Sequence, residues 1–282
     1  VLTLVAELGA ICIALQFATG IAFQWWALPV TFAVWALLWA GNFDVIENGV
    51  SLLGLLTVVF IVAALREQPP LRDIAAGLVP SLAPDDGGRL WFLAVSILGA
   101  TLTPYLFYFY SSGAVEEHWD ERMLTTNRMV ASVGMGFGAV LAAAVLVVSA
   151  TVFGPRGIRL ESYDQLALLL THSLGRWGFA LFVAALAIAC LGAALEITLA
   201  LAYMVAQGFG WSWGENLGHQ EAARFTATYT VALVLAAIPV ALGLDPMRVT
   251  NVAMVLNGGA LPLAVMPFLV LMNDRDNVGV HA

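Results

Sequence analysis

The chain has 282 residues, a formal net charge of −8 and a mean hydropathy of +0.90; 61% of its residues are hydrophobic and only 11% are charged. This composition excludes a soluble domain, which must keep a hydrated polar surface. The eleven basic residues are all arginine. The negative net charge and the lack of lysine argue against nucleic acid or an anionic membrane surface as a partner.

The charged residues cluster in short segments between long apolar runs. A helix needs about 20 apolar residues to cross the hydrocarbon core of a bilayer, and a chain in lipid must satisfy its own backbone hydrogen bonds. The strands of a β-barrel would alternate apolar and polar residues, whereas these runs are apolar on every side. We therefore expect an all-α, polytopic membrane helix bundle with about eight spans, near residues 2–21, 25–41, 46–65, 89–112, 128–153, 176–208, 222–243 and 247–272.

The loops, cysteines and histidines give no sign of a catalytic or cofactor-binding site. Residues 66–88 form the longest polar stretch and predict a surface loop with one short amphipathic piece at 71–79. Cys12 and Cys190 both lie inside apolar runs, which favours small buried hydrophobic side chains over a disulfide or a metal site. The four histidines lack zinc-ligand spacing. Because no catalytic motif is present, we expect neither an enzyme nor a bound cofactor.

One predicted span, 89–112, contains helix-breaking residues at its centre. Its sequence Gly99-Ala100-Thr101-Leu102-Thr103-Pro104-Tyr105 places a proline in the middle of an apolar helix. Proline removes a backbone donor and clashes with the preceding turn, so the carbonyl of Ala100 needs another partner. We predict a discontinuous helix broken at Gly99 and Pro104, because such breaks bind substrate and coupling ions in secondary transporters. A simple proline kink is the alternative.

Other polar residues stand inside the predicted spans. Glu196 is the only charged residue between 177 and 214, and an ionisable group at that depth predicts a functional role. The alternative is that it is protonated or pairs with Tyr203 and only ties helices together. Met254 and Asn257 lie three residues apart on one helix, just before Gly258-Gly259. The acidic run at 116–121 is interpreted as a solvated loop that attracts cations at long range.

At this point the residues resemble the Nramp family of proton-coupled divalent-metal transporters over nearly the whole chain. The sixth helix of that family has the form Gly-Ala-x-x-Met-Pro-His followed by aromatic residues and a serine pair, and residues 99–112 are similar to it. The other similar segments occur in the family's order: Ala6-Glu7-Leu8-Gly9, Ile46-Glu47 with 52–62, Gly77-Leu78-Val79-Pro80, and Asn251-Val252-Ala253 with Leu261-Pro262.

The resemblance implies part of an inverted-repeat, LeuT-like transporter fold. Residues 1–65 would belong to the first repeat, 66–88 to the connecting loop, 89–272 to the second repeat, and 273–282 to the start of a further loop. The chain then looks like a fragment without the family's first two helices and its last. In the family, the missing first helix carries an Asp-Pro-Gly-Asn break whose Asp and Asn ligate the metal. The chain opens on Val1, and no signal peptide is indicated.

The resemblance also assigns site residues, with several departures from the family pattern. The carbonyl of Ala100 is implied as a metal ligand, Thr103 replaces the family's metal-binding methionine, and Tyr105 replaces its histidine. Met254 stands at the position of a tenth-helix glutamine, with Asn257 one turn further on. A hydroxyl is a hard ligand and a thioether a soft one, so these changes resemble the magnesium-permeable branch of the family.

The resemblance leaves Glu7, Tyr105 and Glu196 as ion-path or coupling residues. On the helix of Glu7, a second acidic position of the family is occupied by Leu4, so we expect weak or absent proton coupling. The substrate would be a divalent cation, Mg²⁺ or Mn²⁺, and the location a bacterial inner membrane. The alternatives are a transporter of a small organic solute on the same fold and a non-transporting sensor or assembly subunit.

The orientation in the membrane and the oligomeric state stay open. Arginine counts place the 66–89 loop in the cytoplasm, whereas the topology of the family places it outside.

Overall fold

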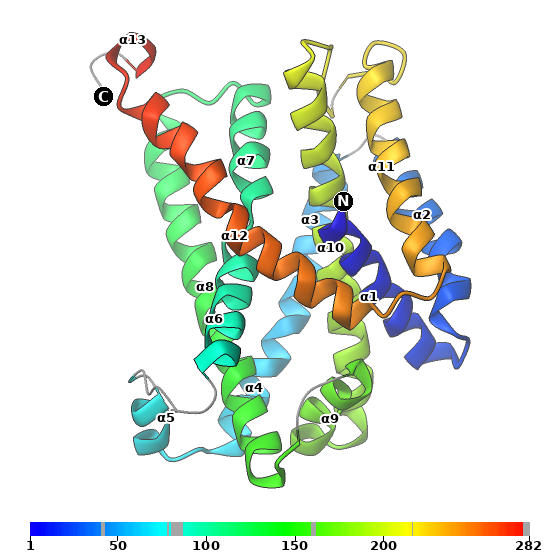
Figure 1. The fold of residues 1–282 in the computed structure, drawn as a ribbon, viewed down its shortest axis with the longest axis vertical. Coiled ribbons are helices and arrows are strands. Elements are labelled where there is room, and N and C mark those ends of the chain that lie inside the picture. The colour runs from blue at the N-terminus through cyan, green and yellow to red at the C-terminus, as the bar shows by residue number, and fades with distance from the viewer. Residues whose placement is uncertain (41–42, 78, 80–86, 159–161, 216, 279–282) are drawn as a thin grey trace.

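A computed structural model describes residues 1–40, 43–77, 79, 87–158, 162–215 and 217–278. Within these residues the chain forms helices and no strand (Figure 1). The α-helices are α1 (Leu2–Thr19), α2 (Phe23–Trp39), α3 (Phe43–Gly54), α4 (Val59–Glu67), α5 (Leu71–Gly77), α6 (Gly87–Thr101), α7 (Pro104–Glu116), α8 (Met123–Phe153), α9 (Tyr163–Leu174), α10 (Arg176–Gly208), α11 (Ala223–Ala241), α12 (Pro246–Met272) and α13 (Arg275–Val278). Short 3₁₀ turns occupy Leu55–Val58 and Gly154–Arg156.

The predicted bundle of apolar helices is confirmed. Among the described residues, seven helical segments are long and apolar enough to cross a membrane, and α2 is a shorter apolar helix of 17 residues. The span predicted at 46–65 is formed by α3 and α4 with a 3₁₀ turn between them, where the Thr57 hydroxyl donates to the Gly54 carbonyl. Such a turn tightens the helix locally without ending the span.

Two features of the loops refine the sequence prediction. The short amphipathic piece expected at 71–79 is α5, whereas Leu78, Pro80 and the acidic run Asp85-Asp86 lie outside the described residues. The prediction missed α9, which the sequence signals only weakly through Asp164 in its first turn. The last four residues of the predicted terminal loop also lie outside the described part of the chain.

The core of the bundle is built around α1. Its side chains Leu4, Leu8 and Cys12 are at most 1% exposed, and α1 packs against α2, α10, α11 and α12. A helix that is apolar on every side fits this central place. The prediction of Cys12 as a small buried hydrophobic residue agrees with its position, and Cys190 is half-buried against the same cluster.

Close contacts join α4, α9 and α10 near the lower end of Figure 1. The Ser173 hydroxyl on α9 donates to Glu67 Oε1 on α4 at 2.5 Å, and Arg66 donates to the Ser173 carbonyl. On α10, a Cβ added to Gly178 would lie 1.9 Å from the Leu170 carbonyl oxygen of α9. The glycine therefore lets the two helices meet backbone to backbone.

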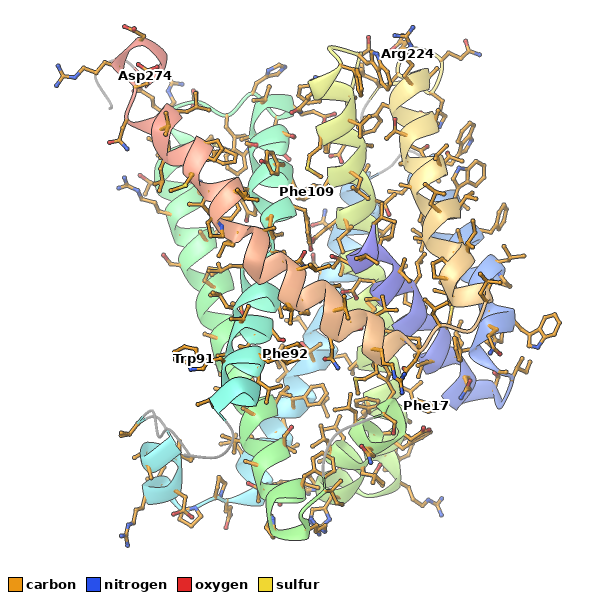
Figure 2. All side chains as sticks on the ribbon, viewed as in Figure 1. Phe17, Trp91, Phe92, Phe109, Arg224 and Asp274 are labelled. Atoms are coloured by element: carbon orange, nitrogen blue, oxygen red, sulfur yellow. The ribbon has the colours of Figure 1, made fainter. Side chains whose placement is uncertain are left out.

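The outer surface of the bundle is apolar between its two ends. Trp25 and Trp177 are each 78% exposed, and Trp91 points away from the bundle in Figure 2. Arg224 and Asp274 both lie at the upper end of that view, next to loops. Exposed apolar side chains between polar ends are what a lipid-facing surface requires.

Candidate functional site

The helix predicted to be discontinuous is interrupted in the structure. Helix α6 ends at Thr101, Thr103 is extended with φ −78° and ψ 133°, and α7 begins at Pro104. A proline is favourable at the first position of a helix because its missing N–H needs no partner there. The N–H that would normally bond the Ala100 carbonyl belongs to residue 104, which is this proline. The C-terminal end of α6 and the N-terminal end of α7 therefore meet at residues 102–103.

These two helix ends give the break a definite electrostatic character. Unpaired carbonyls at the end of α6 attract cations, and the first amides of α7 attract anions. Thr103 is only 5% exposed, whereas Ala100 is exposed. The neighbouring Thr101 directs its hydroxyl back to the Ile97 carbonyl at 2.8 Å. Thr103 is thus the buried hydroxyl at the break, and Thr101 belongs to the outer surface of α6.

Helix α12 crosses α6 at very short range beside the break. A Cβ added to Gly99 would lie 1.9 Å from the Met254 carbonyl oxygen and 2.5 Å from the Gly258 nitrogen. A Cβ added to Gly258 would in turn lie 2.7 Å from the Val95 carbonyl oxygen. Gly99 therefore lies inside α6 as a helix contact, and the interruption itself begins after Thr101. The contact brings Met254 next to the end of α6.

The predicted oxygen ligand on α12 also reaches a third helix. The side-chain nitrogen of Asn257 donates to the Thr3 hydroxyl of α1 at 3.4 Å, a long hydrogen bond. Asn257 follows Met254 by one turn and precedes the glycine that contacts α6. This bond turns the amide nitrogen of Asn257 toward α1. The predicted metal residues thus lie at the end of α6 (Ala100), in the interruption (Thr103) and on α12, which touches α6 (Met254 and Asn257).

The predicted ion-path residues converge on the junction of α1, α7 and α10. Glu7 of α1 lies within electrostatic reach of Cys190 and Glu196, both on α10. Tyr105, in the first turn of α7, lies close to Thr103 and within electrostatic reach of Glu196 and Glu7. Residues from distant parts of the sequence therefore form one polar group directly beside the break.

Two sequence interpretations of polar residues change. Glu116, interpreted as part of a solvated loop, is the last residue of α7, and it accepts a 2.6 Å hydrogen bond from the Tyr203 hydroxyl. The Tyr203 hydroxyl therefore donates to Glu116 and not to Glu196, the partner considered from the sequence. One turn away, Gln207 Nε2 donates to the Ser112 hydroxyl at 2.9 Å. Sequence reasoning missed these contacts because their partners are 87 and 95 positions apart.

A cavity of about 450 Å³ runs between α7, α8 and α10. Glu196, Tyr203 and Glu215 line one side of it, and the α7 residues from Leu106 to Ala114 line another. Phe109 lies between α7 and α10 in Figure 2. Because Glu196 also interacts with Tyr105, this cavity approaches the break from the upper end of the molecule. It is large enough for a hydrated cation.

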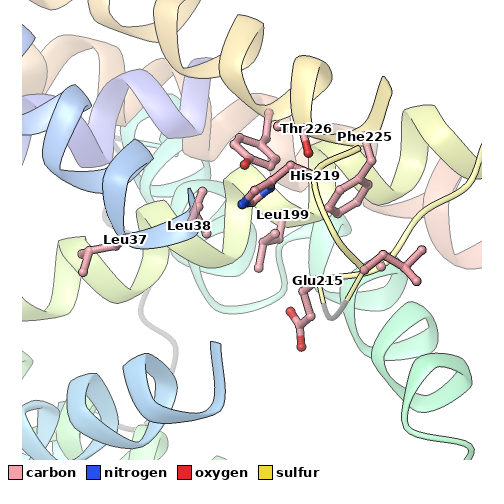
Figure 3. Close-up of a pocket in the computed structure, with 10 residues that line it drawn as sticks. Leu37, Leu38, Leu199, Glu215, His219, Phe225 and Thr226 are labelled. Carbon is pink, nitrogen blue, oxygen red and sulfur yellow. The ribbon is translucent and has the colours of Figure 1, made fainter. Parts of the chain in front are cut away.

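A second cavity, shown in Figure 3, is much smaller. It has a volume of about 20 Å³, and its lining includes Leu38, His219 and Thr226. The His219 ring stacks on Trp39 at 4.0 Å and Nε2 hydrogen-bonds the Trp39 carbonyl at 2.8 Å. A space of this size holds about one water molecule, so it is not a substrate path.

Among the described residues, no group of three or more His, Cys, Asp or Glu side chains is arranged to hold a metal ion. The predicted donors are instead a backbone carbonyl at Ala100, a hydroxyl at Thr103 and an amide oxygen at Asn257. Neutral oxygen atoms of this kind suit hard cations such as Mg²⁺, Ca²⁺ and Mn²⁺.

Comparison with known proteins gives a consistent result. The profile of a family described as natural resistance-associated macrophage protein-like (Nramp) matches residues 1–282. A divalent metal cation transporter MntH of Deinococcus radiodurans is 27% identical over 97% of this chain and 62% of its own length. A divalent metal cation transporter MntH of Klebsiella pneumoniae strain 342 is 28% identical over 81% of this chain and 53% of its own length. The chain thus spans between half and two thirds of these relatives.

Proposed function

This chain belongs to the Nramp family, and we propose that it forms the greater part of a secondary transporter that moves divalent metal cations across a membrane by alternating access. The observation that carries the proposal is the interruption between α6 and α7 within one apolar membrane-spanning segment, held against α12. The names of the two relatives support the substrate class. Both relatives come from bacteria, and we propose a bacterial inner membrane as the location.

The cation is proposed to bind the Ala100 carbonyl, the Thr103 hydroxyl and the Asn257 amide oxygen, with Met254 bordering the site. Mg²⁺ or Mn²⁺ is favoured because all three donors are hard oxygen atoms. Further ligands are expected from parts of the transporter outside this chain. We retain the proposed division into repeats, with 1–65 in the first, 66–88 as the connection and 89–272 in the second.

The direct test is uptake of Mg²⁺ or Mn²⁺ by liposomes that contain the protein as its gene encodes it. Thr103→Ala should lower uptake by roughly 10-fold or more, because it removes an oxygen that contacts a charged ion. Thr101→Ala is the matched control, since its hydroxyl bonds within α6 and faces outward. Absence of metal flux under any gradient would reject the proposal, and uptake of a labelled amino acid instead would support the organic-solute alternative.

The same liposomes test proton coupling. Tyr105 and Leu4 stand where the resemblance expects a histidine and an acid, so we predict that metal entry carries fewer protons than metal ions. An internal pH dye measures this ratio while a metal-sensitive dye reports uptake. Acidification that follows metal entry one for one would contradict the prediction and would point to Glu7 and Glu196 as sufficient proton carriers.

A further inference from the structure

The far end of α7 is fastened to α10 by the two side-chain hydrogen bonds described above. Ser112 and Glu116 are one turn apart on α7, and their partners Gln207 and Tyr203 are one turn apart on α10. The two hydrogen bonds therefore join α7 and α10 at successive turns. We call these four residues the α7–α10 latch.

The surroundings of the latch are built to direct its hydroxyl. Tyr203 is 1% exposed, and its ring packs against Phe225 at 5.1 Å and Trp213 at 5.6 Å, which fixes the position of the hydroxyl oxygen. Gly214 has φ 145°, and a Cβ there would lie 2.9 Å from Glu116 Oε1. A side chain at 214 would thus displace the carboxylate. Glu215 also lies within hydrogen-bonding reach of the Tyr203 hydroxyl.

The latch and the break define the two ends of one short helix. At its first turn α7 starts at Pro104, where no helical hydrogen bond crosses from α6, so residues 102–103 can act as a pivot. At its last turn the latch holds α7 against α10. The cavity with Glu196 lies between these two points, and α7 forms one of its walls. A tilt of α7 would therefore change the width of this cavity.

We propose that Tyr203 is a positioning residue of the transport cycle: its hydrogen bond to Glu116 holds α7 against α10, and its release lets α7 tilt about residues 102–103 and open the cavity that leads to Glu196. This inference rests on the proposed transport function. Both partners of the bond can exchange it for water once the cavity widens, so release leaves no unsatisfied polar group. The contact of Gly99 with α12 is backbone packing, and water cannot replace it when the helices separate.

The test replaces the hydroxyl alone, with Tyr203→Phe, and measures access to the cavity. A cysteine introduced as Ala114→Cys on the cavity side of α7 is labelled with a water-soluble maleimide, and protein without this cysteine gives the background. Loss of a hydrogen bond to a charged acceptor should speed labelling by roughly 10-fold. Tyr229→Phe is the matched control, because Tyr229 is equally buried and its hydroxyl makes no hydrogen bond of normal geometry.

Partner variants separate the bond from general loosening. Glu116→Gln keeps an acceptor and should label at nearly the native rate, whereas Glu116→Leu should match Tyr203→Phe, and the double variant should add nothing further. If Tyr203→Phe fails to fold, Gln207→Leu tests the second hydrogen bond in the same way. Labelling rates in these variants equal to that of Tyr229→Phe would overturn the proposal.

A transport measurement distinguishes positioning from a direct role in metal binding. Tyr203→Phe should change the maximal rate of metal uptake while the equilibrium metal affinity stays native, because Tyr203 lies beyond the break. A changed affinity would overturn the positioning role. The labelling result does not require transport, so a failure of the proposed function and a failure of this inference give different outcomes.

Discussion

The two halves of the broken helix are held by opposite kinds of contact. Helix α6 meets α12 backbone to backbone through Gly99 and Gly258, with no room for a single added carbon. Helix α7 is held by the α7–α10 latch and by aromatic rings, with Phe107 and Tyr108 packed on Phe268 at 5.9 and 5.6 Å. Close packing through small residues is one of the main attractions between helices in lipid. On the tilt proposed above, α6 is the fixed half and α7 the movable one.

The largest effect is expected from adding one methyl group to the fixed half. Gly99→Ala would place its Cβ against the backbone of Met254, which cannot rotate away, so the helices must separate. We expect a loss of about 3 kcal/mol of stability, measured as thermal unfolding in detergent. Gly113→Ala on α7 is the matched control, because nothing lies within 4 Å of an added Cβ there. Equal unfolding temperatures for the two variants would remove the distinction between the halves.

A smaller effect is expected from the aromatic contact of the movable half. Phe268→Leu keeps an apolar side chain on α12 but removes the ring that meets Phe107 and Tyr108. Each aromatic pair contributes about 1 kcal/mol, so stability should fall modestly while α6 stays in place. Hydrogen exchange should rise in α7 and stay unchanged in α6. An equal rise in both halves would show that they move as one unit.

The distribution of the charges along the sequence was enough to predict the membrane spans. The long apolar runs and the proline at 104 correctly predicted the bundle and its interruption, because both follow from local backbone chemistry. Gly99, predicted to be part of the break, lies two residues before the end of α6 and contacts α12; glycine serves both purposes, and the contact depends on a partner helix that the local sequence does not reveal. The metal and coupling roles of the candidate residues remain predictions.

Other features had no local signal in the sequence. The bond between Glu116 and Tyr203 joins positions 87 apart, and the acidic run around Glu116 has the composition of an ordinary solvated loop. Helix α9 is short and amphipathic, so a search for long apolar runs passes over it. The convergence of Glu7 with Glu196 likewise depends on how α1 docks against α10, which the tertiary packing alone decides.

The contacts at the two ends of α10 require particular residues to point in set directions around the helix axis. Near its start Gly178 faces α9, and near its end Tyr203 faces α7. Each residue turns an α-helix by about 100°. Inserting or deleting one residue between these positions would therefore leave one end in register and rotate the other away from its partner. The length of this segment is thus fixed by rotation rather than by the thickness of the membrane.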